Sequence, residues 1–243
     1  MGEVNREDRK AALRGSGPGD GMVRARLRVT HSKTTSSAAV ATPPALSSPK
    51  HQALEKAAVA VFLRDGYAGA SVDDIAREAG VSKATLYSHF RSKEALFGAI
   101  IGQQCGRFVV EAQMADVTHA DPAQVLRKLG QGFLENLLTP HMLALYRVVA
   151  AEAYRFPALG RTVHDSGPGP AKASLAGYFR ELTRKGRLTV KQPEIAADQF
   201  FGALLGGIHV RQILAVEKPP TRRMIETWVD HTVTAFLAAH KPR

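Results

Sequence analysis

The chain has 243 residues, a hydrophobic content of 44%, a formal net charge of +11 and a pI near 10.0. It is long and apolar enough to bury a sizeable core without staples, and its basic balance favours a polyanionic partner. Cys105 is the single cysteine, which excludes an internal disulfide and a multi-cysteine zinc site and fits a reducing cytosol. Because Cys105 falls in a predicted helix, a buried thiol is the more common outcome there than a redox switch.

The first 49 residues are rich in glycine, serine and proline and have no sustained apolar periodicity. We expect residues 1–49 to form a disordered basic tail. Its run RARLRVTHSK is basic enough to touch DNA, but a purely solubilising tail, or a start at Met22, fits at least equally well. No apolar region of signal-peptide type follows the basic residues, and no later stretch is long enough to cross a bilayer. We therefore expect no membrane partner and a cytoplasmic, nucleoid-associated location.

A first helix is predicted to begin at Pro49, with Ser48 as its N-cap, and to end at Gly66. Its apolar residues recur at helical spacing: Leu54, Ala57, Ala58, Val61 and Phe62. This helix should support the next two helices from behind, with Tyr67 packed where the chain turns back.

The stretch 71–96 is typical of a helix, a sharp turn and a second helix. Ser71 is a good N-cap with Asp74 in the capping-box position. Gly80 can adopt the positive φ that ends a helix, and Ser82 can cap a new helix over residues 83–90. The sequence therefore predicts a helix-turn-helix at about residues 72–91.

The second of these helices should bury only Leu86 and Phe90, spaced i and i+4, which leaves a polar face open. That face suits hydrogen bonds to phosphates and base edges in a major groove. A third helix, capped by Ser92, adds a lysine and backbone amides in its first turn. The predicted DNA-binding residues are Ser71, Ser82, Lys83, Ala84, Thr85, Tyr87, Ser88, His89 and Lys93.

Alternatives to DNA contact remain open for this face. Residues 50–100 hold seven Lys or Arg against six acids, so binding must depend on the placement of Lys83, Lys93 and helix N-termini rather than on bulk charge. A helical hairpin with a merely solvated polar face remains the alternative. Tyr87 can also pack on the domain surface, and His89 can be a capping or core-edge residue.

The sequence GYAGASVDDIAREAGVSKATLYSHFRSKEALF resembles the DNA-binding domain of the TetR family of bacterial transcriptional regulators, over about fifty residues. Ala84 departs from the glycine that many members carry, which should alter DNA contact slightly. The resemblance implies a DNA-binding domain over residues 50–110. The matching residues are Phe62, Gly66, Ile75, Ala76, Gly80, Val81, Leu86, Tyr87, Phe90, Lys93 and Leu96.

Beyond Ile100 the pattern stays helical, and no strand pattern competes with it. We expect helices over residues 122–138, 140–155, 170–185, 193–216 and 221–239. The chain is therefore predicted to be all-α, with a helical bundle over residues 111–240. The segment LYRVVAAEAYRFPALGRTVHDSGP resembles the C-terminal domain of the AefR-like subgroup. That resemblance implies a domain that binds a small-molecule effector and forms a homodimer.

The last two predicted helices carry broad apolar stripes. The first is apolar around much of its circumference, and Gly202, Gly206 and Gly207 permit close helix approach. Two such helices from each subunit would form a four-helix interface, and the two-fold symmetry would require a roughly palindromic operator. The alternative is that both stripes face the core of their own subunit. The candidate interface residues are Phe200, Leu204, Ile208, Trp228, Val229 and Phe236.

A pocket for an unknown small-molecule effector can form between the helices of the second domain. The candidate residues are Arg147, Glu152, Phe156, Phe179, Phe201 and His209. Here too there is a simpler interpretation, because phenylalanines at helical spacing are usually core residues. Glu152 and Arg155, at i and i+3, form an intrahelical ion pair by default.

The sequence has no nucleophile elbow, H-E-x-x-H motif, phosphate loop or suitable carboxylate pair, so we predict no enzyme activity, cofactor or metal. With the resemblance, it predicts a homodimeric repressor that binds a palindromic operator in double-stranded DNA and is released by a small-molecule effector. Two alternatives are a nonspecific or architectural DNA-binding protein and a small-molecule enzyme built on a helical bundle.

Overall fold

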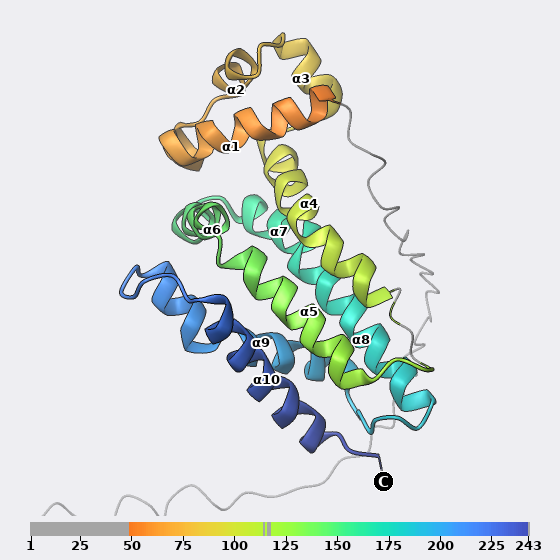
Figure 1. Ribbon diagram of the computed structural model, residues 1–243. Helices are drawn as coiled ribbons and strands as arrows, with labels where there is room; N and C mark the ends of the chain where they lie inside the picture. Colours follow the sequence, from red (N-terminus) through yellow and green to blue (C-terminus); the bar gives the residue numbers. More distant parts are fainter. Residues whose placement is uncertain (1–48, 114, 116–117, 243) are drawn as a thin grey trace, which may run out of the picture. The chain divides into compact units, whose positions relative to one another are not determined.

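The computed structural model describes residues 49–113, 115 and 118–242 (Figure 1). Within these residues all regular structure is α-helical, which confirms the predicted fold class. The predicted tail and the proposed cap Ser48 lie outside the described residues. The ten helices of the described part are α1 Pro49–Gly69, α2 Val72–Glu78, α3 Lys83–His89, α4 Lys93–Gln113, α5 Pro122–Leu137, α6 Pro140–Glu152, α7 Pro157–Ser166, α8 Pro168–Arg184, α9 Pro193–Ile213 and α10 Arg222–Ala239.

Side-chain caps set the boundaries of α2 and α3, as predicted. Ser71 Oγ accepts a hydrogen bond from the Asp74 amide at 3.0 Å, and Ser82 Oγ accepts one from the Thr85 amide at 3.1 Å. Between the two helices Gly80 has φ 67°, a left-handed conformation that L side chains rarely adopt. The helix-turn-helix is therefore fixed by interactions that are local in sequence.

The first helix is interrupted where the sequence predicted its end. Gly66 has φ 70° and ψ 174°, and the short continuation to Gly69 runs in a new direction. The break turns Tyr67 into the core, where it is fully buried beside Phe62 and Phe97. The positive φ at Gly66 thus places the aromatic residue that helps hold α1 to α4.

Two clusters of buried side chains stabilise the described residues. The amino-terminal core contains residues of α1 to α4, including Leu54 and Leu86, together with Met142, Leu145 and Leu159 from α6 and α7. The carboxy-terminal core is formed mainly by residues of α5, α8, α9 and α10. The core around the helix-turn-helix therefore extends beyond residue 110, into α6 and α7.

Helix α4 passes from one core to the other and packs against α7 and α8 (Figure 1). The α4–α7 contact is close, since a Cβ on Gly102 would lie 3.0 Å from the Ser166 carbonyl oxygen. Cys105, one turn further along α4, is half-buried and lies against Gly167. Burial raises the pKa of its thiol to about 11, in keeping with a packed rather than a reactive cysteine.

The sequence did not predict α7, and it placed the start of α8 two residues late. Glycines and prolines between residues 157 and 170 indicate a loop, but in the structure Pro157 and Pro168 both occupy first-turn positions of helices. The two helices meet at Gly167, where a Cβ would come within 2.8 Å of Ile101. The prolines therefore start helices here, and the glycine permits contact with α4.

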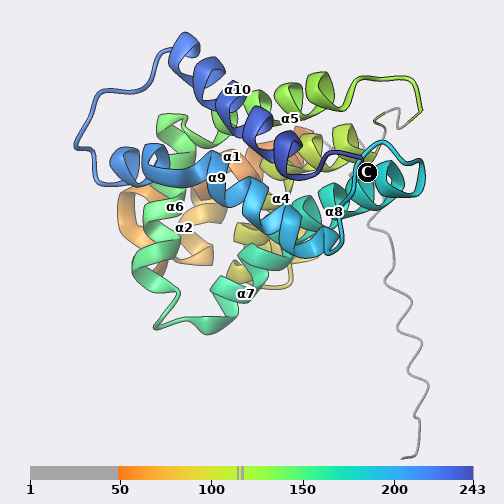
Figure 2. The same cartoon turned by 90° about the horizontal axis from the view of Figure 1, so that it is seen from below.

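Helix α9 packs on α8, and α10 lies along α5 and α9 (Figure 2). Gly206 breaks α9 with φ 32° and ψ −145°, and the indole Nε1 of Trp228 donates to the carbonyls of Ala203 and Leu204 at 3.2 and 3.0 Å. A side chain from α10 thus satisfies carbonyl groups next to the break in α9. In the described part of the chain, no helix has the length and apolar character needed to span a bilayer.

Candidate nucleic-acid interface

Helix α3 presents the predicted polar face to solvent. Its apolar side is covered, because Leu86 is fully buried and the C-cap residue Phe90 is 5% exposed. Tyr87 is 46% exposed even though it is a large aromatic residue. Six of the nine predicted DNA-binding residues are exposed: Ser82, Lys83, Ala84, Tyr87, Ser88 and His89.

An ion pair ties the N-terminus of α3 to α2. Lys83 Nζ lies 2.9 and 3.1 Å from the two carboxylate oxygens of Asp73, and both side chains are more than half exposed. The hydrogen bond and the charge of Asp73 raise the pKa of Lys83, so the ammonium stays charged. Such exposed pairs contribute little to stability. Lys83 can therefore exchange Asp73 for a phosphate at small cost.

The predicted hydroxyl groups already make local hydrogen bonds. Ser71 is half-buried, and its Oγ accepts from the Asp74 amide and donates to the Asp74 carboxylate. Thr85 is also half-buried, with its Oγ1 2.9 Å from Ser82 Oγ. Ser88 Oγ donates to the Thr85 carbonyl at 2.7 Å. The first task of these groups is thus to define α2 and α3.

Lys93 differs from the prediction because its ammonium points into the protein. Its Nζ donates to the backbone carbonyls of Tyr67 and Ala70 at 2.6 and 2.9 Å and lies 4.3 Å from the centre of the Tyr67 ring. Burial lowers the pKa of Lys93, whereas Glu94 and Glu152 favour the charged form. The side chain satisfies carbonyls where α1 meets α2, and this contact ties α4 to both helices.

The C-terminal end of α3 rests on α1. The His89 ring lies 5.8 Å from the ring of His51, which in turn lies 4.7 Å from Phe90. Directly after α3, Arg91 is exposed. Arg91 is not among the predicted DNA-binding residues. Its position in the sequence, as a basic residue between the end of α3 and the next N-cap, Ser92, could have indicated that it belongs to the interface.

The six candidate effector residues are distributed over both cores and the contact between α6 and α9. Phe179 is fully buried and stacks on Phe236 at 4.7 Å in the carboxy-terminal core. Phe201 packs edge-on against Phe133 at 4.9 Å, whereas Phe156 packs against Tyr67 at 5.3 Å in the amino-terminal core. Phe179 and Phe201 therefore share the carboxy-terminal core, whereas Phe156 lies in the amino-terminal core.

Two polar members of that set, Arg147 and His209, both lie where α6 contacts α9. Arg147 donates to the backbone carbonyls of Gln212 and Ile213, both at 2.7 Å, and so joins α6 to the end of α9. His209 is buried against Tyr146, with ring centres 4.7 Å apart, and its Nε2 has no hydrogen-bond partner. Burial lowers the pKa of His209.

Glu152 forms the expected i, i+3 ion pair with Arg155, at a long distance of 3.7 Å. Its Oε2 is buried without a hydrogen bond. The predicted ion pair between Glu152 and Arg155 is therefore present in the structure.

The predicted dimer residues require a correction. Phe200, Leu204, Ile208, Val229 and Phe236 are at most 8% exposed and belong to the carboxy-terminal core of their own chain. Trp228 is half-buried and seals the break in α9. The apolar stripes of α9 and α10 face inward because α5 and α8 supply the opposing apolar surface.

The outward faces of α9 and α10 instead form a groove. Its lining includes Ala203, Met224 and Ala235, two of the predicted dimer residues, Ile208 and Trp228, and the charged residues Arg211, Glu217, Lys218 and Arg223. Met224, which lines the groove, is more than half exposed, and so are Val210 of α9 and its C-cap residue Leu214. These small and apolar side chains on two adjacent helices are a second candidate for the dimer surface.

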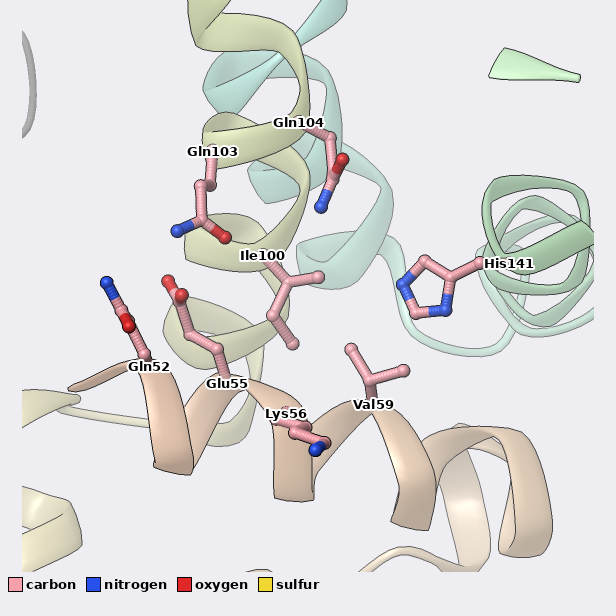
Figure 3. A pocket seen from close by; sticks show the side chains of 8 residues that line it. All are labelled: Gln52, Glu55, Lys56, Val59, Ile100, Gln103, Gln104 and His141. Atoms are coloured by element: carbon pink, nitrogen blue, oxygen red, sulfur yellow. The ribbon is translucent and has the colours of Figure 1, made fainter. Parts of the chain in front are cut away.

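A separate cavity of about 300 Å³ lies where α1, α4 and α6 meet (Figure 3). We call it the junction cavity, and define it by Glu55 and Val59 of α1, Gln103 and Gln104 of α4, and His141 of α6. None of the six candidate effector residues lines the junction cavity or the α9–α10 groove.

Comparisons with known families assign both parts of the chain. Residues 54–100 match the model described as bacterial regulatory proteins, tetR family. Residues 124–242 match the model described as AefR-like transcriptional repressor, C-terminal domain.

The similarity to known proteins covers most of the chain. A solved structure of a TetR-family transcriptional regulator from Mesorhizobium loti is 31% identical, with a TM-score of 0.69, and the match covers 81% of this chain and 99% of that one. The flavonoid-responsive regulator FrrA is 32% identical, with a TM-score of 0.66, over 80% of this chain and 98% of that one. The uncharacterized HTH-type transcriptional regulator YvkB of Bacillus subtilis is 25% identical over 194 residues, which are 78% of this chain and 96% of YvkB.

The matching proteins are DNA-binding transcriptional regulators and not enzymes, which excludes the enzyme alternative. Both resemblances found in the sequence are confirmed, the amino-terminal one by the helix-turn-helix geometry and the carboxy-terminal one by the family match. The chain belongs to the TetR family of bacterial transcriptional regulators, with a C-terminal domain of the AefR-like type.

Proposed function

We propose that this protein is a homodimeric, cytoplasmic, nucleoid-associated repressor that binds a palindromic operator and is released by a small-molecule effector. The observation that carries the proposal is the exposed polar face of α3, which a buried Leu86 and two capping serines hold outward. A dimer would place two copies of this face on two half-sites, so the operator repeats with the two-fold symmetry of the protein.

Within this proposal the exposed side chains of α3 have different roles. Lys83 leaves Asp73 to bind a phosphate, and Tyr87 and the N-terminal part of α3 reach base edges and the sugar-phosphate backbone. Arg91 adds a phosphate contact at the other end of the helix. The amides in the first turn of α4, a helix of 21 residues, supply further phosphate donors.

The outward groove of α9 and α10 is the proposed dimer surface. Its small side chains, such as Ala203 and Ala235, allow a second helix pair to approach closely, and the exposed Val210 and Leu214 would be covered. Of the six residues that the sequence suggested, Ile208 and Trp228 also line this groove, whereas the other four lie in the carboxy-terminal core.

Release by an effector is supported by similarity to a regulator described as flavonoid-responsive. Two-site recognition makes such control effective, because a small change in the separation of the two α3 helices weakens both half-site contacts together. The neighbouring protein's description points to an aromatic, hydroxylated effector for this chain as well.

The test is fluorescence anisotropy of the full-length protein on DNA from upstream of its own gene, with a scrambled duplex at the same salt concentration. We expect binding to the native duplex to be tighter by a factor of about a thousand or more. Equal, salt-sensitive binding to both duplexes would favour the nonspecific DNA-binding alternative.

Three substitutions assign the binding face. Tyr87→Ala should weaken specific binding by about tenfold without loss of stability, whereas Tyr154→Ala, at a tyrosine that is 96% exposed after α6, should change nothing. Asp73→Asn should strengthen DNA binding a few-fold, because it removes a negative charge and releases Lys83. Unchanged DNA affinity in both Tyr87→Ala and Asp73→Asn would refute this face.

The dimer surface has its own matched pair of variants. Ala235→Glu, in the groove on α10, should give folded monomers in light scattering after size-exclusion chromatography. Ala173→Glu introduces the same side chain at an exposed alanine of α8 and should leave the dimer intact. If Ala235→Glu remains dimeric, the groove is not the interface.

A further inference from the structure

The junction cavity lies where the helix-turn-helix meets the rest of the chain. Helices α1 and α4 carry side chains of the amino-terminal core on which α2 and α3 pack, and α6 contacts α1 directly. The cavity, about 300 Å³ in volume, is at the small end of the range typical of ligand sites. Whatever occupies it touches all three helices.

The polar groups around the cavity converge from opposite sides. Figure 3 shows Gln103 and Gln104 extending from α4, Gln52 and Glu55 rising from α1, and the His141 ring reaching in from α6. Each primary amide offers both donors and an acceptor. This arrangement suits a ligand that both donates and accepts hydrogen bonds.

The charges at the cavity favour a neutral ligand. Glu55 is only 7% exposed, and its carboxylate lies 3.2 Å from His51 Nε2 and is also hydrogen-bonded by Gln103. Burial raises the pKa of Glu55, and the contacts with His51 and Gln103 oppose this shift. Lys56 also lines the cavity and is exposed. A neutral O–H group can donate to Glu55 without adding a charge.

One wall of the cavity is apolar. Val59 of α1 and Ile100 of α4 lie between the amide groups and His141 (Figure 3). A flat apolar body fits such a wall, while its polar substituents reach the surrounding amides and carboxylate. An apolar surface flanked by polar groups is the pattern expected for a hydroxylated aromatic compound.

We propose that the junction cavity binds a small, neutral, hydroxylated aromatic molecule whose ring lies on Val59 and Ile100 and whose hydroxyl groups bond to Glu55, Gln103 and Gln104. The proposal rests on the proposed ligand response and names its site. Binding would favour one packing of α6 against α1. It would thereby change the free energy of the dimer conformation in which the two α3 helices fit the operator. Such coupling requires only that the ligand prefer one arrangement over the other.

The experiment uses resorcinol as the probe and isothermal titration calorimetry on the full-length protein. We expect Gln103→Leu and Gln104→Leu each to weaken resorcinol binding by about tenfold, because each removes a hydrogen-bonding partner of the hydroxyl groups. Gln113→Leu, the same change further along α4 and away from the cavity, is the matched control and should bind normally. The analogue 1,3-dimethoxybenzene, which has no O–H donor, should bind about tenfold more weakly than resorcinol.

A second variant tests the link to DNA. Val59→Phe should fill part of the cavity and abolish resorcinol binding. It should also weaken operator binding, as resorcinol should do in the parent protein. Circular dichroism establishes that the variant is folded, and Gln104→Leu serves as the second variant if it is not. Resorcinol binding that is absent, or unaffected by Gln103→Leu and Gln104→Leu, would overturn the proposed site.

The two proposals fail in distinguishable ways. Specific DNA binding without resorcinol binding would leave the regulator intact and remove the junction site. Resorcinol binding sensitive to Gln104→Leu, in a protein that binds no specific DNA, would support the cavity while refuting the proposed function. Resorcinol binding that leaves operator affinity unchanged would overturn the cavity's role as the effector site.

Discussion

The helix-turn-helix and the α9–α10 pair are both helical as predicted, but only the first has the predicted orientation. In α3, seven residues long, the apolar and polar residues separate cleanly, so Leu86 must turn inward and Tyr87 outward. In α9 apolar residues lie on several sides, and either Phe200 or Val210 could face the core. The comparison teaches that segregation of polarity around a helix, more than its hydrophobic content, determines which face can be predicted.

The two regions also differ in what holds them in place. Caps from Ser71 and Ser82 define α2 and α3 within a few residues of sequence. By contrast, α9 depends on distant partners, since Trp228 donates to carbonyls of residues more than twenty positions earlier in the chain. Short helices with local caps should tolerate surface substitutions, whereas α9 should be sensitive to changes in its core.

The largest expected effect is from Phe200→Ala. Phe200 is 1% exposed in the carboxy-terminal core, so the substitution should lower the free energy of unfolding by about 3–5 kcal/mol, measured by urea denaturation. The half-buried neighbour Phe201→Ala should cost less. A stable, folded monomer from Phe200→Ala would reverse the comparison, because it would place Phe200 in an interface after all.

A smaller effect is expected from Lys93→Ala at the helix-turn-helix end. Removing the ammonium leaves the Tyr67 and Ala70 carbonyls without these donors, which should lower the free energy of unfolding by about 1–3 kcal/mol and weaken DNA binding with it. Lys83→Ala is the matched control, since its exposed ion pair should contribute little to stability although it also weakens DNA binding. If thermal unfolding of Lys93→Ala matches that of the parent, Lys93 has no structural role.

The smallest effect concerns pH and sharpens the account of α9. Burial lowers the pKa of His209, so the folded protein binds a proton less readily than the unfolded chain. The stability contributed by neutral His209 should therefore be fully present above about pH 6.5, the ordinary histidine pKa, and fall as the pH drops below it.

His209→Leu keeps an apolar side chain in the same place and cannot titrate. Its Tm should fall less than that of the parent protein between pH 7.5 and about pH 5.5, measured by scanning calorimetry. Identical pH dependence in the two proteins would mean that His209 is protonated as easily when folded as when unfolded.

The sequence by itself determined the helical fold class and, through caps and glycines, the helix-turn-helix. Gly66 and Gly80 have the positive φ values expected of chain-turning glycines, and Ser82 caps α3 as predicted. Such features can be read from sequence because each depends on residues within about one helical turn.

Only the tertiary structure decided which partners those helices meet. It turned Lys93 inward, because the Tyr67 and Ala70 carbonyls follow the break at Gly66 and lie within reach of the Lys93 ammonium on α4. It also turned the stripes of α9 and α10 into the chain's own core, because α5 and α8 provide the matching apolar surface.

The junction cavity likewise depends on tertiary structure. Glu55, Gln104 and His141 come from three helices, and their side chains approach one another only when α6 packs on α1. Their spacing in sequence carries no signal of that meeting. Contacts between residues far apart in the chain depend on how all the helices pack together. No short stretch of sequence specifies that packing by itself.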